Sequence, residues 1–390
     1  TARTILLEQN YRSTQNILSA ANAVISRNSG RREKNLWTAA GDGAPITGYV
    51  ADSEHDEARW ISQEVDRLSD EHGVHPRDVA VFYRTNAQSR ALEEAFMRAG
   101  QPYKVIGGTR FYDRREIKDA IAYLRAVDNP DDDVNLRRIL NVPKRGLGDK
   151  AEGALAEHAA RYAVSFGQAV ADAAGAPREA QTGETENADG QAPSTGAGEP
   201  PEVEGLTTRA RNQVRGFHEL LTTLRHMVTA GDGVADVLDS ALDASGYLAE
   251  LRASDDPQDA TRVENLAELH SVASDFQAAN PDGTLADFLE RVSLVADSDQ
   301  LPPSADLEDE DARKAEEQGQ ITLMTVHTAK GLEFPVVFVT GMEDGTFPHA
   351  RSLAEETELA EERRLAYVAL TRARERLYLT RAAVRSAWGA

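Results

Sequence analysis

Segments with the pattern of β-strands occur only near the two ends of this chain of 390 residues. Strands that alternate with helices predict a parallel sheet whose two faces are covered by helices. Each end carries too few strands for a stable sheet, so we expect one α/β domain that is divided in the sequence. The strand segments are a short one in "ILLEQNYRS", then "PITGYVAD", "DVAVFYRT" and "PYKVIG" near the beginning, and "ITLMTVH", "PVVFVTG" and "RLYLT" near the end.

The sequence between these two parts has the periodicity of helices and almost no β-rich runs. We therefore predict that residues 1–110 and 319–390 form the α/β domain, and that residues 111–318 form a mostly α-helical domain inserted into it. Inside the insertion, residues from about 174 to 205 are poor in apolar side chains and rich in Gly, Pro and Glu. This composition predicts a disordered segment.

Composition limits the classes of protein to which the chain can belong. It contains no Cys, which excludes disulfides and Cys-type metal sites and fits a reducing compartment. No apolar run approaches the roughly 20 residues that span a membrane, and the first residues lack the layout of a signal peptide. We therefore expect a cytoplasmic protein with no membrane partner.

The net charge of −22 would by itself argue against binding to nucleic acid. The acidic residues, however, are concentrated in two stretches, and basic clusters stand elsewhere. Each basic cluster taken alone could equally be a solvated helix face, so charge does not decide whether the chain binds nucleic acid. The basic clusters are "TRFYDRREIK", "RRILNVPKRG" and "EERRLAYVALTRARER".

Two segments far apart in the sequence place Arg residues where ligands often bind. The segment "QNYRST" puts Tyr11 and Arg12 at a predicted strand-to-helix corner, where open α/β sheets meet their ligands, and Ser13 is the expected N-cap of the following helix. In isolation, Tyr11 could equally pack at a rim and Arg12 pair with an acid. Near the end of the chain, Arg372 lies close to the end of a predicted helix, where a surface cation is favourable to the helix C-terminus.

Taken together, Arg12 and Arg372 indicate a bound phosphate. A guanidinium group binds phosphate oxygens in bidentate fashion and stabilises the charge that develops in phosphoryl transfer. The chain has no phosphate-binding loop that ends in Gly-Lys-Ser or Gly-Lys-Thr, since "TVHTAKGLEF" has Lys330 before Gly331, and we predict no metal site. The two Arg residues would therefore grip the γ-phosphate of a nucleotide held by another domain, while a Tyr can stack on its base and a Glu can accept from ribose hydroxyls.

Five segments, in this order and over most of the chain, resemble the C-terminal half of a UvrD/PcrA/Rep-type DNA helicase of superfamily I. The resemblance implies a RecA-like parallel sheet, called domain 2A, that is split in the sequence by a mostly α-helical domain 2B. It also implies that two RecA-like domains sandwich ATP with Mg²⁺ and move 3′ to 5′ along single-stranded DNA. The segments are "LEQNYRSTQNIL", "VFYRTNAQSRALEE", "GGTRFYDRREIKDAIAYLR", "LMTVHTAKGLEFPVVFVTGMEDGTFPH" and "EERRLAYVALTRARERLYLT".

The resemblance implies a role in nucleotide binding for four residues. Tyr11 would stack against the adenine side of the nucleotide, and Glu333 would hold the ribose. Arg12 and Arg372 would be the two arginine fingers on the γ-phosphate.

It likewise implies contacts with DNA. Arg84, Asn86 and His349 would touch the single strand, and His327 and Lys330 would link the strand-binding surface to the nucleotide cleft. The alternatives are a salt bridge at the sheet edge for Arg84 and a turn position for His349.

In the inserted domain, the segment "VPKRGLGDKA" resembles the part of the family that contacts duplex DNA. Gly146 and Gly148 would form a turn whose N–H groups face a phosphate, and Lys144 and Arg145 would supply positive charge. Such contacts reach the duplex backbone without reading its sequence.

The resemblance further implies that the chain is one half of a motor, which alone would neither bind ATP tightly nor hydrolyse it. The expected partners are single-stranded and duplex DNA, the missing N-terminal RecA-like half and repair proteins, in DNA repair or replication restart. One alternative is a non-catalytic scaffold that binds DNA or partner proteins. Another is the helicase part of a helicase–nuclease, whose acidic metal ligands would have to lie in a further domain.

Overall fold

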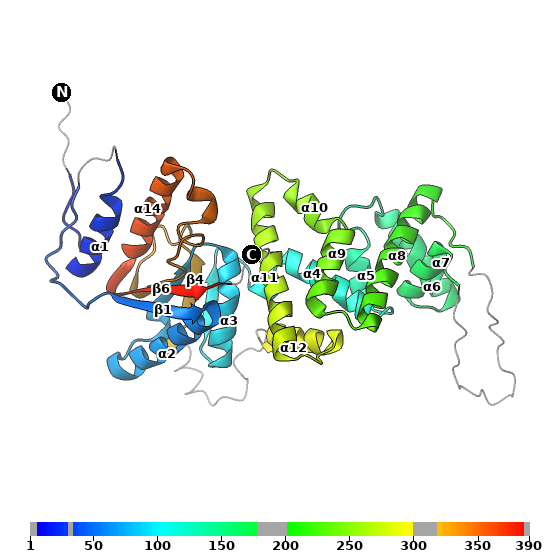
Figure 1. The fold of residues 1–390 in the computed structure, drawn as a ribbon, viewed down its shortest axis with the longest axis horizontal. Helices are drawn as coiled ribbons and strands as arrows, with labels where there is room; N and C mark the ends of the chain where they lie inside the picture. Colours follow the sequence, from blue (N-terminus) through cyan, green and yellow to red (C-terminus); the bar gives the residue numbers. More distant parts are fainter. Residues whose placement is uncertain (1–5, 30–33, 178–200, 299–317, 386–390) are drawn as a thin grey trace, which may run out of the picture. The chain divides into compact units, whose positions relative to one another are not determined.

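The computed structural model describes residues 6–29, 34–177, 201–298 and 318–385. The chain forms two compact units (Figure 1). One unit combines residues 1–114 with residues 295–390, and the other comprises residues 115–294.

The first unit contains a six-stranded sheet in which every pair of neighbouring strands is parallel. Its strand order is β1-β6-β5-β2-β4-β3, so strands from the beginning and the end of the chain are interleaved. This confirms the α/β prediction of a single parallel sheet assembled from both ends. The strands are β1 (Thr47–Ser53), β2 (Val79–Tyr83), β3 (Tyr103–Ile106), β4 (Ile321–Thr325), β5 (Phe334–Val339) and β6 (Ala373–Val384).

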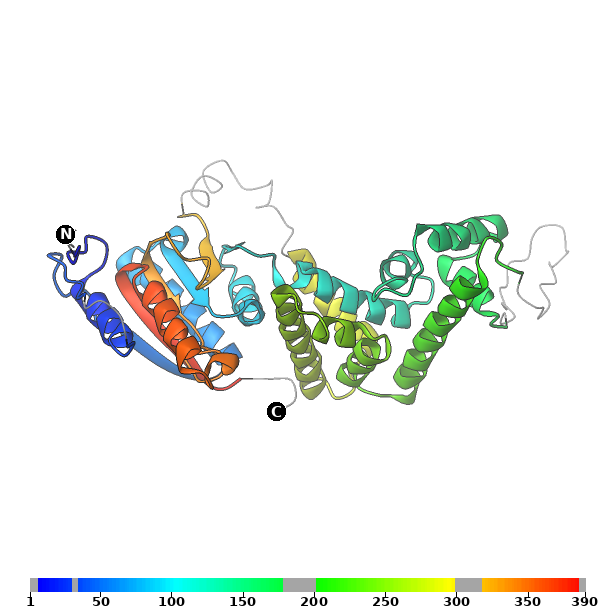
Figure 2. The same cartoon turned by 90° about the horizontal axis from the view of Figure 1, so that it is seen from above.

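Helices cover both faces of this sheet (Figures 1 and 2). On one face, α2 (Glu54–His72) and α3 (Ser89–Arg98) pack against alternate residues of β2, such as Val81. On the other face, α1 (Gln15–Ile25) and α14 (Glu356–Leu370) pack against the intervening residues, such as Phe82. The two-residue period of a strand thus divides the core into two layers, and burial of each large side chain contributes about 1.5–3 kcal/mol.

Local sequence signals set both ends of α2, whereas the predicted cap of α1 does not form. The Ser53 side chain accepts the N–H of Asp56 at the start of α2, and Gly73 ends that helix in the left-handed conformation (φ 65°). The prediction that Ser13 caps α1 was wrong, because the N-cap is Thr14. The Ser13 hydroxyl instead donates to the carbonyl of Ala373 at 2.5 Å, which ties this corner to the start of β6.

The second unit is helical throughout its described part. Its core contains buried side chains such as Leu136, Phe217 and Phe288. Residues 178–200 of the segment predicted to be disordered lie outside the described residues, whereas Ala174 ends a helix and Val203 is buried. The helices are α4 (Arg115–Asp128), α5 (Asp133–Ile139), α6 (Asp149–Tyr162), α7 (Phe166–Ala174), α8 (Thr208–Ala230), α9 (Val234–Ala244), α10 (Tyr247–Arg252), α11 (Pro257–Ala279) and α12 (Leu285–Ser298).

Within the described ranges, no helix combines the length and the apolar character that crossing a membrane requires.

Candidate functional site

Strand direction separates the predicted site residues into two groups at opposite edges of the sheet. Glu333 and Arg372 immediately precede β5 and β6, whose first residues, Phe334 and Ala373, are paired. Arg84 immediately follows β2, and β4 ends at Thr325, which pairs with the last residue of β2. Because all strands are parallel, Glu333 and Arg372 lie on the side of the sheet where the strands begin, which we call the amino edge. Arg84 lies on the side where the strands end, which we call the carboxyl edge.

At the amino edge, Arg12 meets Glu333. The Nε of Arg12 forms an ion pair with Oε2 of Glu333, and its Nη1 donates to the carbonyl of Thr371 at 3.4 Å. The Asn10 side chain accepts the backbone N–H groups of Arg12 and Ser13 at 2.8 and 2.9 Å, which fixes the corner. The hydrogen bond from Arg12 lowers the pKa of Glu333, which therefore stays ionised at neutral pH.

Arg372 lies beside this pair and is bound mainly to backbone oxygens. Its Nε donates to the carbonyl of Val368 at 3.1 Å, and its Nη1 donates to the carbonyl of Leu332 at 3.2 Å. Burial and the neighbouring positive charge of Arg12 lower the pKa of Arg372. Two guanidinium groups therefore stand near one carboxylate, an arrangement that favours a further anion.

Tyr11 projects from the same corner and is 85% exposed. An exposed aromatic ring offers a flat face for stacking. The alternative contacts expected from the sequence are also present at this edge: Arg12 pairs with an acid, and Arg372 binds the last turn of α14. The nucleotide roles of these residues remain predictions.

At the carboxyl edge, Arg84 forms a bidentate ion pair with Glu362 of α14. The Nη2–Oε1 distance is 2.7 Å, and Nε lies 3.1 Å from both carboxylate oxygens. The carboxylate also accepts the backbone N–H of His349 at 3.1 Å. The salt bridge expected as the alternative for Arg84 is thus formed, and it brings Arg84 and His349 together.

The other predicted DNA-side residues follow strands of the same edge. Asn86 begins a short 3₁₀ helix after β2 and is half-buried. His327 follows β4, and burial together with the charge of Arg84 lowers its pKa. Lys330 is exposed on the segment that leads from β4 to β5. This segment crosses from the carboxyl edge to the amino edge, because β4 and β5 point in the same direction.

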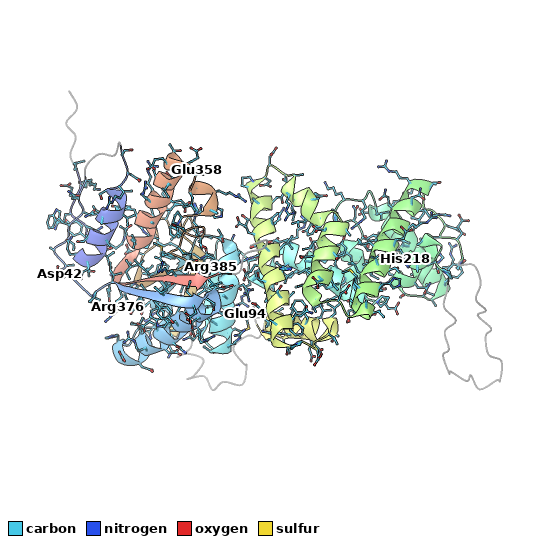
Figure 3. The ribbon with its side chains drawn as sticks, in the orientation of Figure 1. Asp42, Glu94, His218, Glu358, Arg376 and Arg385 are labelled. Carbon is cyan, nitrogen blue, oxygen red and sulfur yellow. The ribbon has the colours of Figure 1, made fainter. Side chains whose placement is uncertain are left out.

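An ion network holds the loop that leads to His349. Arg385, labelled in Figure 3, follows β6 and donates to Glu57 at 2.5 Å and to Glu343 at 2.6 Å. Glu57 also accepts the N–H of Gly341 at 3.0 Å. These bonds to buried Glu57 anchor the start of the loop that leads from β5 to His349.

Sequence reasoning missed Glu362, although the sequence contains a signal for it. The buried residues Ala366 and Ala369 follow it at helical spacing on one face of α14. An acid on an apolar helix face predicts a buried cationic partner.

In the helical unit, Arg145 holds the predicted duplex-contacting turn in place, and its guanidinium group does not project from the turn into solvent. Its Nη1 donates to the carbonyls of Ile139 at 3.0 Å and Val142 at 2.9 Å, and its Nη2 donates to the hydroxyl of Tyr123 at 2.5 Å. The side-chain oxygen of Asn141 accepts the N–H groups of residues 145 and 147. The turn is therefore fixed from inside the unit.

The remaining members of that turn face solvent. Lys144, Gly146 and Gly148 are exposed, and Gly148 is the N-cap of α6. Gly146 has a φ of 76°, which favours glycine over residues with a side chain.

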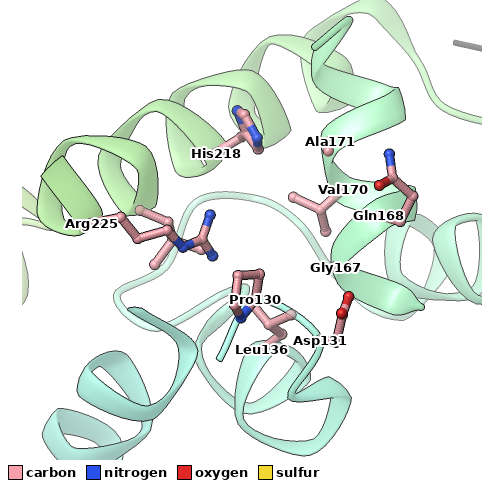
Figure 4. A pocket seen from close by; sticks show the side chains of 10 residues that line it. Pro130, Asp131, Leu136, Gly167, Gln168, Val170, Ala171, His218 and Arg225 are labelled. Carbon is pink, nitrogen blue, oxygen red and sulfur yellow. The ribbon is translucent and has the colours of Figure 1, made fainter. Parts of the chain in front are cut away.

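A pocket of about 90 Å³ lies elsewhere in the helical unit (Figure 4). His218 and Arg225 of α8 point into it from one side, and Asp131 lines the other. Burial, followed by the charge of Arg225, lowers the pKa of His218. In the described part of the chain, no group of three or more His, Cys, Asp or Glu side chains is placed to hold a metal ion.

Comparison with known proteins identifies the family. Residues 5–383 match the model of the UvrD-like helicase C-terminal domain. The chain belongs to this family. The helicase resemblance predicted from the five sequence segments is thereby confirmed.

Curated relatives are similar over nearly the whole chain. The ATP-dependent DNA helicase UvrD1 of Mycobacterium tuberculosis is 53% identical over 401 residues, which cover 99% of this chain and 47% of the relative. The ATP-dependent DNA helicase PcrA of Bacillus subtilis is 42% identical over 391 residues, covering 100% of this chain and 48% of the relative. The chain thus spans about half the length of the curated relatives that it matches.

Proposed function

We propose that the chain is the C-terminal motor part of an ATP-dependent DNA helicase or translocase that moves 3′ to 5′ on single-stranded DNA. It would act in the cytoplasm, in DNA repair or replication restart, together with an N-terminal RecA-like half that carries the phosphate loop and the Mg²⁺ ligands. One observation supports this most strongly. Arg12, Glu333 and Arg372 come from three distant segments and meet at one edge of the sheet, in a chain of the helicase family.

At the amino edge, ATP bound to the N-terminal half would present its γ-phosphate to Arg12 and Arg372. A phosphate oxygen would replace the Glu333 carboxylate on Arg12, because both are anions that a guanidinium group binds in the same geometry. The released Glu333 would then accept hydrogen bonds from the ribose, and the exposed Tyr11 would stack on adenine. The two positive charges would stabilise the transferring phosphoryl group.

At the carboxyl edge, the single strand would run past Asn86, Arg84 and His349. Arg84 uses Nε and Nη2 for Glu362, so its outer Nη1 would approach the strand while the ion pair holds the side chain in place. His327 and Lys330 lie on the segment that joins the two edges and would couple them. Binding and release of ATP would then change the distance between the two RecA-like halves and move the strand.

In the helical unit, the turn at residues 144–148 would contact the duplex backbone. Lys144, Gly146 and Gly148 are on its exposed side, whereas the N–H groups of residues 145 and 147 are bound to Asn141. Arg145 would contribute by holding the turn in shape, since its guanidinium group is already bound to main-chain carbonyls.

The direct test compares this chain with the full-length protein that contains it. We expect the full-length protein to hydrolyse ATP, and single-stranded DNA to increase the rate. The chain alone should show no hydrolysis above the buffer rate, because Arg12 and Arg372 need a nucleotide bound by the other half. Hydrolysis by the chain alone, or a full-length protein that ignores DNA, would reject the proposal.

A further inference from the structure

We propose that Glu362 is the positioning residue through which the DNA-binding edge of the sheet is connected to the nucleotide-binding edge. This inference rests on the proposed function, because it takes the carboxyl edge to bind the strand and the amino edge to bind ATP. Glu362, on α14, would couple the two edges in addition to His327 and Lys330 on the segment between β4 and β5.

The Glu362 carboxylate is enclosed by residues that are proposed to touch the strand. Its side chain is only 5% exposed, and it binds the guanidinium group of Arg84 in bidentate fashion. It also accepts the backbone N–H of His349 at 3.1 Å. A buried carboxylate that lost these charge-assisted bonds would be an unpaired charge in a medium of low dielectric constant. A strand that shifts Arg84 or His349 therefore also acts on Glu362.

Helix α14 connects Glu362 to the amino edge. At 1.5 Å per residue, about 12 Å of α14 separate Glu362 from its last residue, Leu370. Arg372 donates to the carbonyl of Val368 in the final turn, so its guanidinium group follows the helix end. Ala366 and Ala369 bury the intervening turns against the sheet. Because close-packed helices move as units, a shift at Glu362 reaches Arg372.

The segment between β4 and β5 also lies close to α14 at the carboxyl edge and contacts Arg372, just after α14, at the amino edge. At the carboxyl edge, the N–H of Val326 donates to the carbonyl of Tyr83 at 2.9 Å, which holds the start of the segment beside Arg84. Burial and then the charge of Arg84 lower the pKa of the next residue, His327, and the charge of Glu362 opposes them. At the amino edge, the carbonyl of Leu332 accepts a hydrogen bond from Arg372 at 3.2 Å. The two connections between the edges thus share Glu362 at one end and Arg372 at the other.

The test uses Glu362→Gln in the full-length protein, which preserves the shape of the side chain and removes its charge. The readout is the ratio of the ATPase rate with saturating single-stranded DNA to the rate without DNA. We expect this ratio to fall about tenfold, within the range of typical coupling between sites. Glu358→Gln is the matched control, because Glu358 lies one turn before Glu362 on the same helix and is exposed. Its ratio should equal that of the wild type.

Several results would separate the possible explanations. A purely structural role for Glu362 would lower both rates together and leave the ratio unchanged, and that result would overturn the inference. If Glu362→Gln does not fold, the double variant Arg84→Gln/Glu362→Gln removes both charges of the buried pair, and its ratio should equal that of Arg84→Gln alone. A further fall in the double variant would also overturn the inference. A wild-type protein without DNA-stimulated hydrolysis would instead reject the proposed function itself.

Discussion

Arg12 and Arg372 differ in what each must give up to bind a phosphate. Arg12 is paired with a carboxylate that is 44% exposed, so exchange of Glu333 for a phosphate costs little beyond the loss of a surface ion pair. Arg372 is bound to the carbonyls of Leu332 and Val368, which are neutral acceptors, and the neighbouring Glu333 carboxylate is bound by Arg12 instead. Arg372 is therefore the stronger candidate for direct charge stabilisation.

We predict that Arg372→Ala in the full-length protein lowers the DNA-stimulated ATPase rate by about 10³-fold or more, as expected for loss of an arginine finger. Arg372→Lys should recover little of this, since an ammonium group lacks the planar fork. Arg381→Ala is the control, because Arg381 is exposed and lies farther along β6. A steady-state ATPase assay checks all three variants, and a rate for Arg372→Ala near that of the wild type would remove this residue from the proposed machinery.

Arg145 and Lys144 are adjacent in sequence, but we predict opposite effects for them. Arg145→Lys should destabilise the helical unit by about 1–3 kcal/mol, because buried carbonyls lose their donors. Lys144→Ala should leave stability unchanged, since this side chain is exposed, and should reduce the salt dependence of duplex binding by about one ion. Urea unfolding and duplex titrations at several salt concentrations measure both effects. Equal stability of the two variants would contradict the structural role of Arg145.

At the scale of elements, hydrophobic period was enough to predict the six strands, whereas the short strand expected in "ILLEQNYRS" is present among the described residues only as an isolated bridge at Gln9. Partners that lie far away in sequence were not predictable in the same way. Ser13 has a residue type suited to a cap, yet its hydroxyl is bound to the carbonyl of Ala373. Arg145 lies in a basic cluster, yet it points into the unit. In both cases tertiary contacts override a local preference that the sequence alone displays.

The pocket between α7 and α8 leads to a prediction about pH. Burial and Arg225 lower the pKa of His218, so the folded state takes up a proton less readily than the unfolded state. As pH falls below about 6.5, the ordinary value for His, the unfolded state is protonated first and the free energy of unfolding decreases. Above that pH, His218 should contribute no pH dependence.

His218→Gln should therefore lose part of the destabilisation that the wild type shows between pH 7 and pH 5.5, values chosen to bracket about 6.5. The measurement is the difference between the two proteins in their urea midpoints across this interval, which cancels the other titrating groups. His226→Gln removes an exposed His from the same helix and should behave as the wild type does. A parallel pH dependence for His218→Gln and the wild type would show that His218 is not the group responsible.

At the scale of the whole molecule, the order of elements along the chain has a physical consequence. The sheet is complete only when β4, β5 and β6 from the end of the chain join β1, β2 and β3 from its beginning. The helical unit between them has a core of its own. Folding of the sheet must therefore close a long loop, and that closure costs less entropy once the helical unit is compact.

Separate cores predict that the two units lose stability independently. Phe338 is fully buried in the α/β unit, and Phe288 is fully buried in the helical unit. Replacement of either by Ala should cost about 3–5 kcal/mol, because each leaves a cavity in a close-packed core. We expect calorimetry of the intact chain to resolve two transitions, with Phe338→Ala lowering one and Phe288→Ala lowering the other. If both variants lowered one common transition by the same amount, the chain would unfold as a single unit and residues 115–294 would not be an independent domain.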